Sequence, residues 1–151
     1  AATWTSPNSY DIRPDARRFE NWEMNHAGKL GLTAAIDYAQ AWGLERIAER
    51  VQQLATSLRL GLKPLRGCRV LDLGSHPCGI VSFTLDSLEP LSIKQRLQVQ
   101  RINVSVSPRE YTLLDMQFRG LESVVRASVH YYNTEQELDR FLAAIDLLAH
   151  E

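Results

Sequence analysis

Apolar residues recur every three or four positions along two consecutive segments, which predicts a pair of amphipathic helices. The first covers residues 26–42, and Gly43 after it is a common helix stop. The second, residues 44–62, carries the clearest helical pattern of the chain. Its apolar stripe consists of Leu44, Ile47, Ala48, Val51, Leu54, Ala55, Leu58 and Leu62. Its other side is filled by Arg46, Glu49, Arg50, Gln53 and Arg59.

After Pro64 and Gly67 the pattern changes to short apolar or β-branched runs, which are typical of strands. These runs occupy residues 69–73, 80–85, 102–106, 111–114 and 124–129. Residues 74–79 read Gly-Ser-His-Pro-Cys-Gly, a composition typical of a loop. A further helix is predicted at residues 92–100.

The last helix has a readable start. Thr134 and Glu137 have the spacing of a capping box, in which each side chain bonds the other residue's backbone amide. Its apolar stripe consists of Leu138, Phe141, Leu142, Ile145 and Leu148. This order of elements predicts an α+β fold, a two-layer sandwich in which helices cover a mostly antiparallel sheet.

The first 25 residues show no lasting period, and Pro7, Asn8, Pro14 and Asp15 are turn formers. We therefore expect residues 1–25 to be an irregular lead-in segment and residues 26–151 to be the folded domain. The aromatic residues Trp4, Tyr10 and Phe19 indicate that the segment packs on another surface.

Composition narrows the functional classes. The chain has 151 residues, of which 44% are hydrophobic and 23% charged, as in a soluble globular domain. A formal net charge of −1 gives no general attraction to nucleic acid or to an anionic membrane, and no apolar run has membrane-spanning length. Cys68 and Cys78 lack metal-ligand spacing. Two cysteines allow one disulfide, but we expect a reduced, cytoplasmic protein.

No catalytic constellation is visible in the residues alone, because the histidines are scattered and no GxSxG turn presents a serine. Arg126 is unusual, since it lies in the middle of the apolar run 124–129. An arginine in such a strand needs an anionic partner unless it faces solvent. An internal ion pair, a solvent-facing position and an anionic ligand are all compatible with the sequence.

Residues 126–141, Arg-Ala-Ser-Val-His-Tyr-Tyr-Asn-Thr-Glu-Gln-Glu-Leu-Asp-Arg-Phe, resemble the C-terminal signature of class V aminotransferases and the related cysteine desulfurases. Residues 16–20, Ala-Arg-Arg-Phe-Glu, are similar to the Arg-Phe-Glu motif that follows the large domain in this family. Residues 31–38 and 43–47 resemble the helix pair that opens its small domain. The resemblance covers nearly the whole chain in the family's order.

This resemblance implies the small C-terminal domain of a fold-type I enzyme, whose large domain holds pyridoxal phosphate on a lysine. It also implies an amino-acid substrate, a homodimer, and a substrate-binding Arg126 that holds the α-carboxylate. We add Asn103 and Arg109 as candidate substrate-binding residues, because they lie on and after a predicted strand near the expected mouth of the domain. No catalytic, cofactor-binding or metal-binding residue is assigned to this part of the enzyme.

The chain departs from the family pattern at three places, and each changes the expected activity. None of Lys29, Lys63 and Lys94 has the cofactor-lysine context, so we expect the chain alone to be inactive. Residues 107–114 contain no cysteine where desulfurases carry their nucleophile, so protein persulfide chemistry is not expected. Residues 21–23 replace a Gly-Thr pair that contacts the neighbouring subunit's cofactor phosphate. The parent enzyme is expected to be an aminotransferase, epimerase or lyase; the alternative is a free-standing small-molecule-binding or regulatory module.

Overall fold

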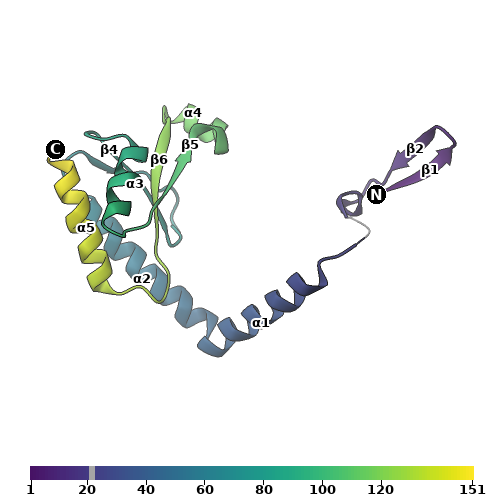
Figure 1. Ribbon diagram of the computed structural model, residues 1–151, viewed down its shortest axis with the longest axis horizontal. Helices are drawn as coiled ribbons and strands as arrows, with labels where there is room; N and C mark the ends of the chain where they lie inside the picture. The colour runs from purple at the N-terminus through teal and green to yellow at the C-terminus, as the bar shows by residue number, and fades with distance from the viewer. Residues whose placement is uncertain (21–22) are drawn as a thin grey trace. The chain divides into compact units, whose positions relative to one another are not determined.

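A computed structural model describes residues 1–20 and 23–151 of the chain, and its contacts divide the chain into two compact units (Figure 1). The first unit is Ala1–Trp42 and the second is Gly43–Glu151. The predicted start of the folded domain at residue 26 differs from this division and stays a prediction. None of the helices in the described part of the chain is long and apolar enough to cross a membrane.

The first unit begins with a β-hairpin, not with an irregular segment. Strands β1 (Ala2–Ser6) and β2 (Ser9–Ile12) pair antiparallel, with Trp4 opposite Tyr10. Pro7 and Asn8 are the two residues between the strands, so the turn formers were recognised but not the hairpin they connect. Each strand has only four or five residues, which is too short for a period of two to stand out.

The rest of the first unit is the 3₁₀ helix η1 (Ala16–Phe19) and the helix α1 (His26–Trp42), the latter with the predicted bounds. No residue of α1 is buried. Trp4 and Phe19 are 72% and 77% exposed, so the packing surface expected for these aromatics is not found within the unit. The rings of Trp4 and Tyr10 contact each other edge to face instead, with centroids 5.8 Å apart.

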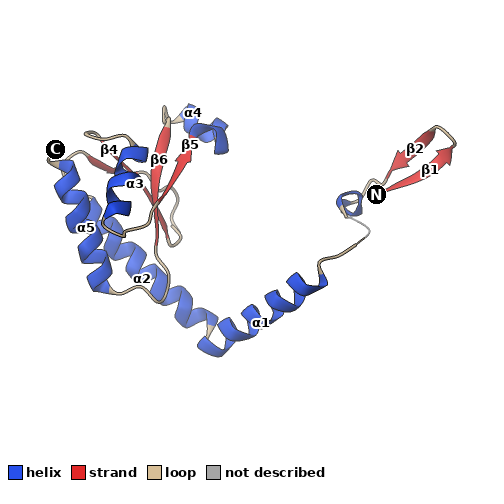
Figure 2. Ribbon diagram, viewed as in Figure 1, coloured by secondary structure: helices blue, strands red, loops and turns tan. Residues whose placement is uncertain are grey.

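The second unit is an α+β domain, which confirms the predicted fold class (Figure 2). Its sheet has the strand order β3-β4-β6-β5, and every neighbouring pair is antiparallel. The strands are β3 (Cys68–Val70), β4 (Ile80–Leu85), β5 (Ser105–Pro108) and β6 (Ser123–Ser128). The helices are α2 (Leu44–Leu62), α3 (Pro90–Val99), η2 (Arg109–Tyr111), α4 (Leu113–Phe118) and α5 (Glu135–Ala149).

Helices α2, α3 and α5 lie on one side of this sheet and close the main core (Figure 1). Because side chains alternate along a strand, β4 and β6 each send every second residue into this core. The ring of Phe83 meets that of Phe141 from α5 edge to face, with centroids 6.1 Å apart. The strand residues of the core are Val81, Phe83, Leu85, Val125 and Ala127.

Several local predictions differ from the structure; the strand predicted at residues 69–73, for example, is formed only by Cys68–Val70. Residues 111–114 form no strand but the end of η2 and the start of α4, whose Met116 is buried against Leu121 and Val124. Strand β5 begins at Ser105, because Ile102 still donates its amide to Leu97 of α3. Arg59 was placed on the polar side of its helix, yet it is only 9% exposed.

Candidate functional site

Arg126 lies in the interior of β6, one of the two central strands of the sheet. Its neighbours Val125 and Ala127 are buried in the helix-side core, so alternation directs the Arg126 side chain to the opposite face. In register, Arg126 lies between Ser82 of β4 and Ser105 of β5. We call this face, which α2, α3 and α5 do not cover, the open face.

Among the described residues, the Arg126 guanidinium has a hydroxyl partner and no acidic one. Its Nη1 donates to Oγ of Ser107, 3.3 Å away, and Ser107 is only 8% exposed. Within residues 1–20 and 23–151, no acidic side chain forms an ion pair with Arg126. The internal ion pair that the sequence left open is therefore not formed among these residues.

Two hollows meet at Arg126. The larger, of about 470 Å³, extends toward α4 and is bounded there by Thr112, Met116 and Arg119. The smaller, of about 260 Å³, extends toward the loop before β4 and is bounded there by Pro77 and Cys78. Both hollows are also lined by Asp72, Leu73, Ser82 and Arg126. An anion bound to Arg126 would thus have space on two sides for the rest of its molecule.

Asp72 in this wall is held by two donors. Its Oδ2 accepts from Arg59 Nε at 2.7 Å and its Oδ1 accepts from the Ser82 amide at 2.8 Å. Arg59 reaches there from α2 and also donates to the carbonyls of Cys78 and Ile80, at 2.6 and 3.1 Å. The side chains of Arg59 and Asp72 are only 10% and 14% exposed. This buried pair joins α2 to the segment after β3 and to the start of β4.

Arg109 lies at the far end of β5 from this site and is engaged locally. Its Nε donates to the carbonyl of Leu121 at 3.0 Å, and its Nη2 forms an ion pair with Glu122. Arg109 lines neither hollow beside Arg126. The structure does not bring Arg109 and Arg126 together, and a substrate-binding role for Arg109 stays a prediction.

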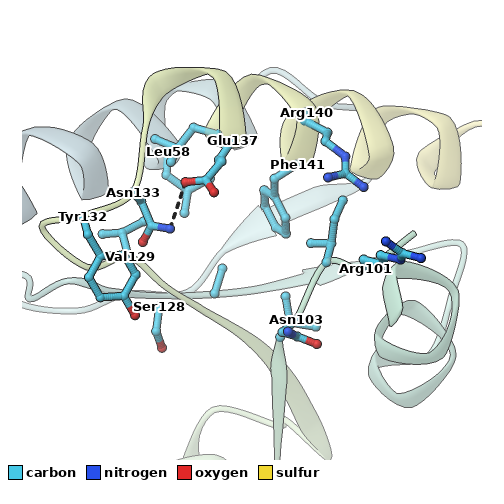
Figure 3. Close-up of a pocket in the computed structure, with 14 residues that line it drawn as sticks. Leu58, Arg101, Asn103, Ser128, Val129, Tyr132, Asn133, Glu137, Arg140 and Phe141 are labelled. Carbon is cyan, nitrogen blue, oxygen red and sulfur yellow. Dashed lines mark hydrogen bonds between the residues drawn. The ribbon is translucent and has the colours of Figure 1, made fainter. Parts of the chain in front are cut away.

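Asn103 lies in a different hollow, of about 360 Å³, between the start of β5 and α5 (Figure 3). Figure 3 shows Tyr132 and Asn133 on one side of this hollow, and Arg101 and Arg140 on the other. Arg126 is not among the residues that line it. The three candidate substrate-binding residues, Asn103, Arg109 and Arg126, therefore lie in three different places in the structure.

The Tyr-Asn-Thr stretch after β6 has a structural role in this chain. Asn133 Oδ1 accepts from the His130 amide at 2.7 Å, and Asn133 Nδ2 donates to Glu137 at 3.2 Å. Thr134 and Glu137 form the predicted capping box. Arg50 of α2 donates to both carboxylate oxygens of Glu135 and lowers the pKa of that carboxyl to about 2. These bonds fix the connection that follows the Arg126 strand onto α2 and α5.

Both cysteines are free thiols. Cys68 of β3 packs against the helix-side core, and this burial raises the pKa of its thiol to about 11. Cys78 is exposed and lines the smaller hollow beside Arg126. In the described part of the chain, no three His, Cys, Asp or Glu side chains are grouped to hold a metal ion.

Comparison with known proteins identifies the family. The pattern of the family described as Aminotransferase class-V matches residues 2–141, and the chain belongs to this family. A cysteine desulfurase of Synechococcus elongatus is 35% identical over 88% of this chain, which spans 21% of that protein. The chain therefore corresponds to about a fifth of that relative's length.

Solved structures agree with this assignment. The apo cysteine desulfurase of Thermococcus onnurineus superposes with a TM-score of 0.80 and 28% identity, over 99% of this chain and 37% of that one. The cystine C–S lyase C-DES, solved with its product cysteine persulfide, superposes with a TM-score of 0.67 and 30% identity, over 88% of this chain and 32% of that one. A C-DES mutant carries glycine covalently linked to its PLP cofactor.

These relatives indicate pyridoxal phosphate as the cofactor. None of the lysines in the described residues is placed to bind this cofactor beside Arg126. Lys63 follows α2, Lys94 lies on α3, and neither lines a hollow next to Arg126. Lys29, in the first unit, donates to the Met24 sulfur at 3.0 Å. The predicted departure at residues 21–23 is not tested, because Asn21 and Trp22 lie outside the described residues.

Proposed function

We propose that this chain supplies the substrate-carboxylate site of a pyridoxal-phosphate enzyme of class V that acts on an amino acid. The supporting observation is the state of Arg126, a central-strand arginine that contacts a buried serine hydroxyl and no acid among the described residues. A guanidinium binds a carboxylate through two parallel hydrogen bonds, which fixes both the position and the orientation of the substrate. The hydroxyl of Ser107 limits the rotation of the guanidinium before the substrate arrives.

The cofactor, when bound, supplies the electron sink for chemistry at the substrate's Cα. We assign only carboxylate binding and orientation to the residues of this chain. The cofactor lysine is proposed to lie outside Lys29, Lys63 and Lys94, so the chain alone is proposed to be inactive. A homodimeric, cytoplasmic parent enzyme remains part of the proposal.

Within the family we propose chemistry that needs no protein persulfide, of the aminotransferase, epimerase or lyase type. Residues 107–114 contain no thiol and form the end of β5, η2 and the start of α4. Cys68 packs against the core with a raised thiol pKa, which disfavours the nucleophilic thiolate. C-DES, a lyase acting on cystine, is a 30% identical precedent in the fold for sulfur chemistry that releases cysteine persulfide as a product.

The test replaces Arg126 in the full-length enzyme. Arg126→Ala should raise KM for the amino-acid substrate by about 30- to 1,000-fold, the equivalent of about 2–4 kcal/mol for a lost charge-assisted bidentate contact. Loading of the cofactor, followed by its visible absorbance, should stay unchanged. Arg126→Lys keeps the charge but loses the fork, and should lie between the wild type and the alanine variant.

Wild-type kinetics in Arg126→Ala would disprove the carboxylate site. The persulfide part is tested separately by incubating the full-length enzyme with L-cysteine and analysing the Cys78 peptide by mass spectrometry. Cys78 is the thiol to examine because it lines a hollow beside Arg126. A stoichiometric extra sulfur on Cys78, with activity lost in Cys78→Ser, would assign desulfurase chemistry instead.

A further inference from the structure

Among the charged side chains that line the two hollows at Arg126, positive charges outnumber negative ones. Two acids line them, Asp72 and Asp115, against three arginines, which are Arg59, Arg119 and Arg126. Each acid has an arginine of its own. Asp72 pairs with Arg59 at 2.7 Å, and Asp115 pairs with Arg119 at 3.1 Å. Of these three arginines, Arg126 is the one left without a carboxylate partner among the described residues.

Asp72 is the acid with the greatest potential to interfere with Arg126. It lines both hollows together with Arg126, and its Oδ1 bonds the amide of Ser82, the residue directly opposite Arg126 in register. It is 14% exposed, so water solvates its carboxylate poorly. A carboxylate in that place needs a cationic partner, and without Arg59 the guanidinium of Arg126, which lines the same two hollows and has no acidic partner among the described residues, could take that role.

Arg59 removes this competition. Its Nε holds Oδ2 of Asp72, and its Nη2 is fixed by the carbonyls of Cys78 and Ile80, so the pair has little freedom to separate. Without Arg59, Asp72 would act as an internal carboxylate at millimolar or higher effective concentration next to Arg126. It would then compete with the substrate for the same fork.

Building on the proposed function, we infer that Arg59 is a positioning residue that occupies Asp72 and thereby keeps Arg126 free for the substrate's carboxylate. Arg59 acts through Asp72, the carboxylate it holds. The buried ion pair between α2 and the segment after β3 therefore affects substrate affinity as well as holding these elements together.

The experiment compares Arg59→Met, Asp72→Asn and the double variant in the full-length enzyme. KM and kcat are measured with L-cysteine, or with the proteinogenic amino acid that the enzyme turns over fastest. Arg59→Met should raise KM by about 10-fold or more while kcat changes less than about 3-fold, because a competing carboxylate weakens binding without altering the bound complex. The double variant should return KM to within about 3-fold of the wild type, because no competitor remains.

Arg50→Met is the matched control. Arg50 also lies on α2 and also pairs with an acid, Glu135, but neither residue lines a hollow beside Arg126. Its KM should stay at the wild-type value. Thermal unfolding and cofactor loading of each variant report whether the fold is kept.

The outcomes separate the two proposals. If Arg126→Ala raises KM but a folded Arg59→Met does not, the positioning role is overturned and the carboxylate site stands. If Arg59→Met does not fold, the double variant decides: a raised KM in the folded double variant overturns the role, since Asp72 can no longer compete. If neither Arg126→Ala nor Arg59→Met changes KM, the carboxylate site itself is wrong.

Discussion

The two faces of the four-stranded sheet are built from neighbouring residues and have opposite properties. On the helix-covered face, Val81, Phe83 and Val125 are fully buried against α2, α3 and α5. On the open face, Ser82, Ser105 and Arg126 form a polar row in register, with two hollows beside it. Because side chains alternate between the faces, a core residue and a residue of the candidate site can be direct neighbours in the same strand.

This difference shows how one strand serves both stability and binding. The alternation along β6 holds Arg126 between two buried residues, so packing on one face fixes a charged group on the other. A loop residue would lose more side-chain freedom on binding, and its position would be less precise. Substitutions on the helix-covered face should therefore affect stability, and substitutions on the open face should affect binding.

The largest effect is expected on the helix-covered face. Phe83→Ala removes a fully buried ring that packs on Phe141, and should lower the free energy of unfolding of the domain by about 3–5 kcal/mol. Ser82→Ala, one residue away on the open face, should cost no more than about 0.5 kcal/mol. Hydrogen exchange of the β4 and β6 amides in the full-length protein measures both. Equal losses of protection in the two variants would break the distinction between the faces.

The two thiols sharpen the comparison chemically. Cys68 packs against the helix-side core, and this burial raises the pKa of its thiol from an ordinary value of 9 to about 11. At any pH below 9, the fraction of Cys68 present as thiolate is therefore about 100-fold lower than that of an ordinary cysteine. Cys78 is exposed beside the open face. Under iodoacetamide at mildly alkaline pH, Cys78 should be alkylated first, and the Cys68 rate should keep rising until the pH passes about 11. Peptide mass spectrometry over time measures the two rates, and faster labelling of Cys68 would contradict the assignment.

The smallest effect is expected within the open face. Ser107→Ala removes the acceptor of Arg126 Nη1 and should raise KM by about 2- to 10-fold with kcat unchanged, as expected for the loss of one hydrogen bond of about 0.5–1.5 kcal/mol. Ser105→Ala is the matched control, because Ser105 Oγ donates to the Arg126 backbone carbonyl at 3.5 Å and not to the guanidinium. A KM that rises equally in both variants would mean that Ser107 acts through the strand and not through Arg126.

Much of the domain could be predicted from local pattern. The bounds of α1, α2 and β4 agree with the predicted ones, and so does the capping box of α5, because each depends on a local pattern of residues close together in the chain. The hairpin at residues 2–12 and the helix α4 were not predicted. Each of these elements is short, and the burial of Met116 against Leu121 and Val124 determines α4 more than its own residue preferences do.

The sequence by itself determined the family and singled out Arg126, because the motif 126–141 is contiguous and an arginine in an apolar strand is conspicuous without any structure. Only the tertiary structure decided which arginines share a site. Arg109 pairs with Glu122, Asn103 lies in another hollow, and Arg59, which belongs to the polar side of a helix by pattern, is buried against Asp72. Pairing of charges far apart in the chain depends on how strands and helices are brought together, and no periodicity in the sequence records it.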